Sequence, residues 1–308
     1  DLLGPSVACR FRRSVEPACG LYALRHFLKG ILMLSDKTAL EVLLLSRLYF
    51  YTLLHKSFGG EPTKELLDVL CGESTKDVLE EYSDDETIAK LLRYLASIKE
   101  KKLSDPSFFD AVHDEYVRMF YGFDPDSAPL AESAYLSGNG GYFNEVTLSV
   151  RDFYRNEGML PAKYPRVPDD HLSLEMGFMA TLANRALQMF RKGDLEAFRI
   201  QIMRQREFLE QHAVRWTPLF AERVRSGKNT QLYPQLIVAA SAFMQVDLGF
   251  VAEVISWTEH SESDAAEMPN DDDQAVDFAS LNLVVEALTA MRLPHLEDNE
   301  FESVDTEL

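Results

Sequence analysis

Apolar residues recur at steps of three and four along almost the whole chain. Phe109, Val112, Tyr116 and Phe120 show this spacing in one window, and similar windows follow. Such spacing places the apolar side chains on one face of a helix, whereas strands would show sustained alternation of apolar and polar residues. The pattern therefore predicts an all-α protein.

Turn-forming residues separate the expected helices. Gly59-Gly60-Glu61-Pro62, Asp124-Pro125-Asp126, Gly138-Asn139-Gly140-Gly141 and Tyr164-Pro165-Arg166-Val167-Pro168 each interrupt the pattern. Glycine and proline clusters of this kind end helices and form loops. We expect helices near residues 21–34, 36–58, 62–71, 75–82, 85–101, 105–121, 143–157, 170–192, 194–212, 213–226, 231–257 and 274–292.

This division predicts a compact body at residues 36–257, made of two packed helical halves joined by a hinge loop at about 122–142. An N-terminal extension, residues 1–35, precedes the body, and an acidic C-terminal extension, residues 258–308, follows it. The C-terminal extension is expected to be mobile over 259–273 and to contain the helix at 274–292, whose apolar positions have helical spacing.

The charge of the chain narrows its possible partners. The formal net charge is −19 over 308 residues, and −14 of it falls after Trp257, where Arg292 is the single basic residue beside fifteen acids. A protein that binds DNA or RNA must neutralise phosphates, so nucleic acid is an unsuitable partner. Acidic runs such as Asp271-Asp272-Asp273 are typical of solvated extensions, and capture of a basic partner is the alternative.

Cysteine content and hydropathy indicate where the protein works. The three cysteines, Cys9, Cys19 and Cys71, form no Cys-x-x-Cys pair and leave one residue unpaired in any disulfide scheme. This favours a reducing compartment, the cytoplasm. The longest uncharged run, 229–246, contains several polar residues and suits a buried helix better than a bilayer. We therefore expect no stable membrane insertion.

Signatures of enzymes are missing from the sequence. Gly138-Asn139-Gly140-Gly141 and Gly227-Lys228-Asn229 do not complete a phosphate-binding motif, and no Gly-x-Ser-x-Gly elbow or catalytic cysteine motif occurs. The segment Pro168-Asp169-Asp170-His171-Leu172-Ser173-Leu174-Glu175 carries the densest chemistry. If a helix begins at Asp169 or Asp170, His171 and Glu175 lie on one face, beside carboxylates at the positive helix end. A helix cap, a metal site and an acidic lip for a cationic ligand are all compatible with this pattern.

Three blocks of the sequence resemble the redox-enzyme maturation chaperones of the TorD/DmsD/NarJ type. The first is Glu115-Tyr116-Val117-Arg118-Met119-Phe120-Tyr121-Gly122, with Glu132-Ser133-Ala134-Tyr135-Leu136 after a loop. The second runs from Val150-Arg151-Asp152-Phe153-Tyr154 to the Pro-Asp-Asp-His segment and Glu175. The third is Glu207-Phe208-Leu209-Glu210-Gln211-His212, followed by Trp216. The resemblance covers about residues 40–250, and Ala131 departs from the aromatic residue that many relatives carry.

The resemblance implies an all-helical cytoplasmic chaperone without catalytic turnover or a cofactor of its own. Its partners would be the twin-arginine signal peptide and the apo catalytic subunit of a molybdopterin oxidoreductase, which the chaperone holds for cofactor insertion before export. Paired arginines beside an apolar helix call for carboxylates beside a groove. The residues expected to line the signal-peptide site are Tyr116, Met119, Phe120, Glu132, Tyr135, Pro168, Asp169, Asp170, His171 and Glu175.

Several alternatives stay open at this level. A metal-dependent hydrolase would use Asp169, Asp170, His171 and Glu175, and a general helical adaptor would need none of them. His171 would act either as a neutral acceptor or as a cation favoured by its acidic neighbours. The hinge would permit a domain-swapped homodimer. The acidic extension is expected to tune affinity without forming the site, because exposed charges are screened over about 8–10 Å.

Overall fold

The computed structural model describes residues 34–122, 127–137, 144–162, 167–225, 230–261, 279–291 and 301–303. Nearly all of the expected N-terminal extension, the helix expected at 21–34, most of the stretch 259–273 and parts of the expected hinge lie outside these residues. Within them the chain is almost entirely helical, which confirms the predicted fold class.

The first half of the described chain forms helices around one long central helix. Its elements are α3 (Leu34–Phe58), α4 (Lys64–Leu70), α5 (Glu73–Glu81), α6 (Glu86–Ser104), α7 (Phe108–Tyr116) and a π-helical turn, η1 (Val117–Tyr121). Side-chain caps start several of them. Asp85, for example, accepts hydrogen bonds from the backbone N–H groups of Thr87 and Ile88 at 2.8 and 3.2 Å. Such caps satisfy donors that have no partner inside the helix.

The second half begins with short elements and continues with long helices. Its elements are α8 (Ser133–Leu136), α9 (Glu145–Asn156), β1 (Met159–Pro161), α10 (Leu172–Arg191), α11 (Leu195–Phe208), η2 (Leu209–Ala213), α12 (Val214–Arg225) and α13 (Tyr233–Ser261). Gly193, at φ 75°, makes the tight turn from α10 to α11, which an L side chain would resist. The helices expected at 105–121 and 194–212 each end in a π-helical turn that periodicity did not predict.

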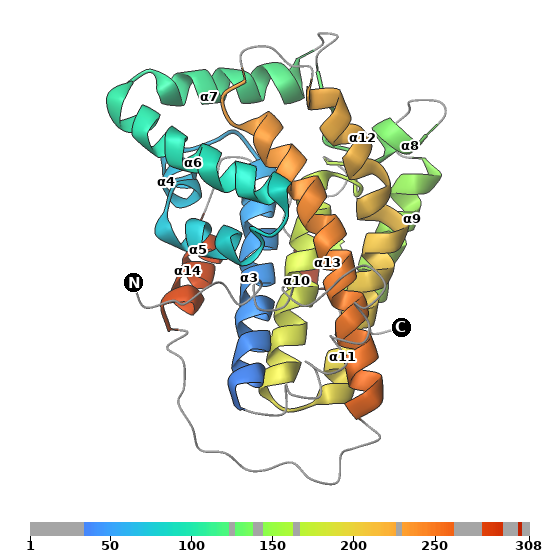
Figure 1. The fold of residues 1–308 in the computed structure, drawn as a ribbon. Coiled ribbons are helices and arrows are strands. Elements are labelled where there is room, and N and C mark those ends of the chain that lie inside the picture. The colour runs from blue at the N-terminus through green and yellow to red at the C-terminus, as the bar shows by residue number, and fades with distance from the viewer. Residues whose placement is uncertain are drawn as a thin grey trace.

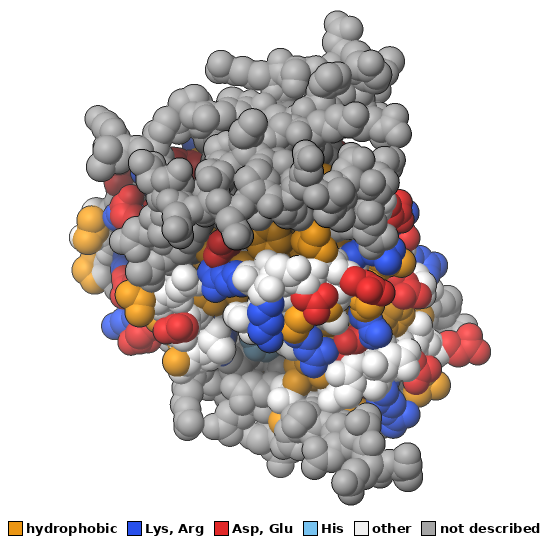
Figure 2. Space-filling model, turned by 90° about the horizontal axis from the view of Figure 1, so that it is seen from below, with side chains coloured by type: hydrophobic (Ala, Val, Ile, Leu, Met, Phe, Trp, Pro, Cys, Tyr) orange, Lys and Arg blue, Asp and Glu red, His pale blue; other side chains and the backbone are white. Residues whose placement is uncertain are grey.

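The two halves share one hydrophobic core. Helix α3 lies beside α10 at the centre, α11 packs against both α10 and α13, and α13 also contacts α6 and α12 (Figure 1). Buried polar groups tie α3 to α13, because Arg47 donates from Nη2 to Oδ2 of Asp247 at 3.0 Å and to Gln205 at 2.7 Å. Seen from below, described acidic and basic side chains intersperse around apolar ones (Figure 2).

Among the described residues one helix, Tyr233–Glu259, is long and apolar enough to cross a membrane by length and composition. Half of its most apolar window is buried inside the protein, and it carries the paired Asp247. Neighbouring helices contact it along its length. In this structure α13 is therefore a core helix of the bundle.

Elements beyond α13 return to the body. Helix α14 (Ala279–Ala290) packs against α3, burying Val285 and Leu288, and the buried Lys56 donates to the carbonyl oxygen of Met291 at 2.8 Å. Strand β2 (Phe301–Ser303) pairs antiparallel with β1, opposite Met159–Pro161. The ring of Phe301 lies 4.9 Å from that of Tyr154 on α9. Described parts of the C-terminal extension therefore belong to the packed body.

Candidate functional site

The Pro-Asp-Asp-His segment lies against the chain that leads into α8. The backbone N–H of Leu172 donates to the carbonyl of Leu130 at 2.7 Å, and that of Glu132 donates to the carbonyl of Asp170 at 2.9 Å. Ala131 and His171 form an antiparallel bridge between these bonds. The structure thus brings Glu132 next to the acids of the second block, although almost 40 residues separate them in sequence.

The start of α10 differs from the expected start at Asp169 or Asp170. The helix begins at Leu172, and His171 is its N-cap, with Nδ1 accepting from the backbone N–H of Ser173 at 3.2 Å. An aspartate cap, one of the interpretations left open for this segment, is not observed, because the bridge to Ala131 keeps His171 extended and because Asp170 binds elsewhere. Pro168 shapes the approach, since its carbonyl accepts from the N–H of His171 at 3.0 Å.

Asp170 is completely buried and bonded at both oxygens. The N–H of Ser133 donates to Oδ2 at 2.7 Å, and the hydroxyl of Thr147 donates to Oδ1 at 3.0 Å. Ser133 belongs to α8 and Thr147 to α9, so the carboxylate fastens both helices to the loop before α10. A direct contact between Asp170 and a ligand would require these bonds to open.

Asp169 is also completely buried and holds α9 from a second point. Arg151 donates to Oδ2 from Nε at 3.2 Å and from Nη2 at 2.7 Å, and the hydroxyl of Tyr154 donates to the carbonyl oxygen at 2.8 Å. A buried carboxylate is stable only with such partners. The two aspartates together fix three side chains of α9: Thr147, Arg151 and Tyr154.

Glu132 and Glu175 form a buried carboxyl pair behind η2. Both side chains are fully shielded from solvent, and one carboxyl oxygen of each, Oε1, has no hydrogen-bond partner among the described residues. Desolvation raises the pKa of Glu132, and desolvation together with the charge of Glu132 raises the pKa of Glu175 well above its ordinary value. Both shifts favour the protonated, neutral carboxyl group, because burial penalises the charged form and two nearby carboxylates repel each other.

Glu132 and Glu175 also bind side chains of η2 and α12. Nδ1 of His212 on η2 lies 2.9 Å from Oε2 of Glu132, and Nε1 of Trp216 on α12 donates to Oε2 of Glu175 at 3.1 Å. Nε2 of His212 reaches the hydroxyl of Ser149 on α9 at 3.2 Å. The π-helical turn η2 positions His212 for these contacts, and such turns are frequent at functional sites.

His171 is uncharged at neutral pH. Desolvation by the surrounding atoms, with a smaller contribution from His55, lowers its pKa to about 4. No neighbouring acid contributes an opposing shift. Of the two roles considered for His171, the neutral acceptor is the one that the structure favours.

The aromatic residues expected at the site fall into two clusters. Tyr116 and Phe120 pack with Tyr233 and Phe58 at ring distances of 4.8 to 6.2 Å, and Met119 is 8% exposed. Tyr135 instead lies beside Trp216 at 5.4 Å, close to the carboxyl pair. Among the predicted aromatic and apolar residues, these contacts place only Tyr135 next to the acid cluster.

Two adjoining hollows open between α9 and η2, and we call them together the α9–η2 groove. The smaller, about 270 Å³, has Glu132 and His212 at its floor and Glu145 and Arg215 at its rim. The larger, about 820 Å³, extends toward α11 and the end of α13. Ser149 and Gln211 line both, so the two hollows adjoin.

The larger hollow combines an apolar lining with an acidic rim. Apolar side chains come from α9, α10, α11 and α13: Phe153, Phe178, Ile200, Met203 and Ile255. Acids surround them: Asp152, Glu157, Glu207, Glu210 and Glu259. Arg204 pairs with Glu157 and Arg206 with Glu210.

Three acids of this rim are left for a ligand. Glu207 accepts only the neutral amide of Gln211, at 3.1 Å, and Asp152 and Glu259 have no cationic partner within the described part of the chain. All three are exposed. The rim therefore offers unneutralised carboxylates beside exposed apolar surface, including Met203, which is 45% exposed.

Sequence reasoning did not assign several residues of this site. His212, Trp216, Asp152 and Glu207 stood in the matching blocks without a role, and Met203 lay outside them. The sequence could have indicated Asp152 and Phe153 as site residues, because an acid and an aromatic residue stand side by side there in the second matching block. The π-helical turn at η2 left no signal in the apolar spacing. Within the described residues, no group of three or more His, Cys, Asp or Glu side chains is placed to hold a metal ion.

Comparisons with known proteins agree with the residue blocks. The family model described as nitrate reductase delta subunit matches residues 79–222. The chaperone protein TorD of Vibrio cholerae serotype O1 is 24% identical over 226 residues, which cover 73% of this chain and 97% of that protein. TorD of Photobacterium profundum is 24% identical over 196 residues, 59% of this chain and 89% of the relative.

A relative named for the assembly of a different enzyme is also similar to this chain. The perchlorate reductase assembly chaperone protein of Dechloromonas aromatica is 31% identical over 105 residues, 33% of this chain and 45% of that protein. No solved structure matches the chain significantly. Together with the all-helical fold and the three residue blocks, these matches show that the chain is similar to the nitrate reductase delta subunit family and to the TorD and perchlorate reductase assembly chaperones.

Proposed function

We propose that this chaperone works in the cytoplasm, binds the twin-arginine signal peptide of a molybdenum-containing oxidoreductase subunit, and holds the apo subunit for cofactor insertion before export. The observation that carries the proposal is the α9–η2 groove, where unneutralised carboxylates border apolar surface. A twin-arginine signal offers the complement, two guanidinium groups beside an apolar segment. The function is binding without turnover, in keeping with relatives that are named as chaperones.

In this proposal the arginines pair with Asp152 and Glu207 on the rim, and the apolar segment lies on Phe153, Ile200 and Met203. Guanidinium groups bind carboxylates in a planar, two-pronged geometry that ammonium groups cannot reproduce. The apolar contacts add affinity in proportion to the area removed from water.

The Pro-Asp-Asp-His block supports the groove from behind. Asp169 and Asp170 hold the α9 wall through Arg151 and Thr147, while Glu132 holds the η2 wall through His212. Because the block fixes the α9 wall and binds the backbone of Glu132, altering it changes the shape of the groove even without touching the peptide. Of the residues expected at the site, Glu132 lines the smaller hollow and is therefore the one placed to meet a bound peptide.

Calorimetric titration with a synthetic twin-arginine signal peptide tests the proposal. An exposed charge pair contributes up to about 1 kcal/mol, so Asp152→Asn and Glu207→Gln should each weaken binding by about 5-fold, and by about 30-fold together. Glu100→Gln is the matched control, because Glu100 is exposed on α6 outside the groove. A peptide with lysines replacing the paired arginines should bind more weakly than the natural one.

The outcome that contradicts the proposal is equally concrete. If the double variant keeps its circular dichroism spectrum and binds the peptide as tightly as Glu100→Gln does, the rim acids do not receive the arginines. Binding of unrelated helical peptides with equal affinity would favour the general adaptor instead.

A further inference from the structure

A separate hollow, about 570 Å³, lies away from the α9–η2 groove, between α6, the end of α12 and the first turns of α13. It shares no lining residue with the α9–η2 groove. Val238 lines this hollow and Ile255 lines the groove, and at 1.5 Å per residue the two positions are about 25 Å apart along α13. The two sites can therefore be altered independently.

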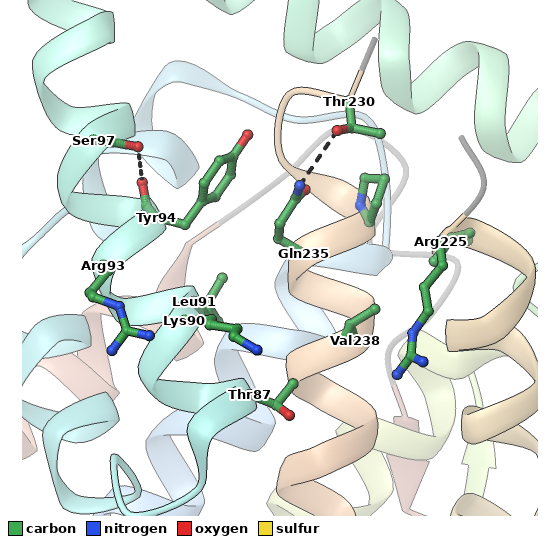
Figure 3. Close-up of a pocket in the computed structure, with 12 residues that line it drawn as sticks. Thr87, Lys90, Leu91, Arg93, Tyr94, Ser97, Arg225, Thr230, Gln235 and Val238 are labelled. Atoms are coloured by element: carbon green, nitrogen blue, oxygen red, sulfur yellow. Dashed lines mark hydrogen bonds between the residues drawn. The ribbon is translucent and has the colours of Figure 1, made fainter. Parts of the chain in front are cut away.

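The charge of this hollow is opposite to that of the chain. Lys90, Arg93 and Arg225 line it, and none of its described lining residues is acidic. Lys90 has no anionic partner within the described residues, and its ammonium group is drawn between α6 and α13 (Figure 3). The protein carries a net charge of −19, so three cationic side chains around a hollow without acidic lining residues indicate a binding site for an anion.

The two arginines remain available to a ligand. Arg93 bonds Glu86 at 2.9 Å and Arg225 bonds Glu222 at 3.3 Å, but all four side chains are at least 60% exposed. Exposed pairs of this kind contribute little and exchange readily with another carboxylate. Each guanidinium group also keeps donors that these bonds do not use.

Between the cations the lining surface is mainly apolar, and Thr87, Ser97, Thr230 and Gln235 add uncharged polar groups. Leu91, Tyr94 and Val238 contribute apolar surface, and the hydroxyl of Tyr94 donates to the carbonyl of Gln231 at 2.8 Å, which fixes its ring. Oε1 of Gln235 is buried without a partner among the described residues, while its amide nitrogen faces Thr230 at 3.4 Å. A hollow of this volume that combines apolar surface with placed polar and charged groups is the usual form of a small-ligand site.

We propose that this hollow binds a small amphipathic acid, a single carboxylate or sulfonate group carried on an apolar or aromatic body. The acidic group pairs with Lys90 and Arg225, the body contacts Tyr94 and Val238, and an N–H or O–H of the ligand donates to Gln235. This proposal does not depend on the signal-peptide function.

The probe for this site is 8-anilinonaphthalene-1-sulfonate, an aromatic sulfonate with one N–H, titrated into the full-length protein by fluorescence. We expect saturable binding at one site, weakened about 5- to 10-fold by Lys90→Gln and again by Arg225→Gln. Lys192→Gln, which neutralises an exposed cation at the end of α10, should leave it unchanged. The neutral analogue N-phenyl-1-naphthylamine should bind more weakly, and inorganic sulfate should compete only at high concentration.

Three results would overturn the proposal. They are an absence of saturable binding, binding that neither Lys90→Gln nor Arg225→Gln changes in folded protein, and equal affinity for the neutral analogue. A twin-arginine peptide should not displace the probe. Displacement with an unchanged response to both substitutions would place the probe in the α9–η2 groove.

Discussion

Replacing Asp170 tests whether the Pro-Asp-Asp-His block supports the structure from inside. In Asp170→Ala the N–H of Ser133 and the hydroxyl of Thr147 lose their acceptor, and all three residues are fully buried. Losing a hydrogen bond to a charged group costs about 1.5–3 kcal/mol. We therefore expect the free energy of unfolding to fall by about 3–5 kcal/mol.

Asp170→Asn should be much milder. Its amide oxygen can accept from Ser133, and its amide nitrogen can donate to the hydroxyl of Thr147, so both contacts persist as neutral bonds. Neutral bonds contribute about 0.5–1.5 kcal/mol each, which predicts a loss of about 1–2 kcal/mol. Removing the negative charge of Asp170 also weakens the electrostatic repulsion on the carboxyl groups of Glu132 and Glu175. That charge is among the causes of their raised pKa values.

Urea denaturation followed by circular dichroism at 222 nm measures both losses, with Thr147→Val as a control that removes a single bond. The expected order of stability is wild type, Asp170→Asn, then Asp170→Ala, with similar slopes. An Asp170→Ala protein within 1 kcal/mol of wild type would refute the supporting role. Equal losses in the two Asp170 variants would show that the charge, not the bonding geometry, matters.

Three further predictions concern other buried contacts. The raised pKa of Glu175 means that the folded protein retains a proton that the unfolded chain releases, so stability should fall as pH rises above about 4.3 toward that raised value, by at most about 1.4 kcal/mol per pH unit. Glu175→Gln should flatten this fall in denaturation measured from pH 6 to 9. Gly177→Ala should lower stability by about 1–3 kcal/mol, seen as a lower melting temperature, because its Cβ would lie 2.9 Å from Nδ1 of His55 and 3.4 Å from the Phe301 ring. Lys56→Ala should speed hydrogen exchange in α14, since the Lys56 ammonium bonds the carbonyls of Thr289 and Met291 at the helix end, and unchanged exchange there would contradict this.

Helical periodicity was enough to locate the long helices. The expected ranges 36–58, 85–101 and 231–257 differ from α3, α6 and α13 by no more than four residues at either end. Apolar spacing works here because each helix buries one continuous face in a shared core. Short elements escaped prediction, since α8, β1 and β2 have three or four residues each and depend on partners distant in sequence.

The candidate site divides in the same way between sequence and tertiary structure. The residue blocks alone indicated the resemblance to the maturation chaperones, and they named Glu132, Asp169, Asp170 and Glu175 among the residues of one site. Only the tertiary structure showed that these acids are buried and bonded to α9, η2 and α12, and that the acids open to a ligand are Asp152, Glu207 and Glu259. Local sequence determines helix formation through backbone hydrogen bonds and one-sided burial, whereas the burial of a carboxylate depends on long-range packing that no local pattern encodes.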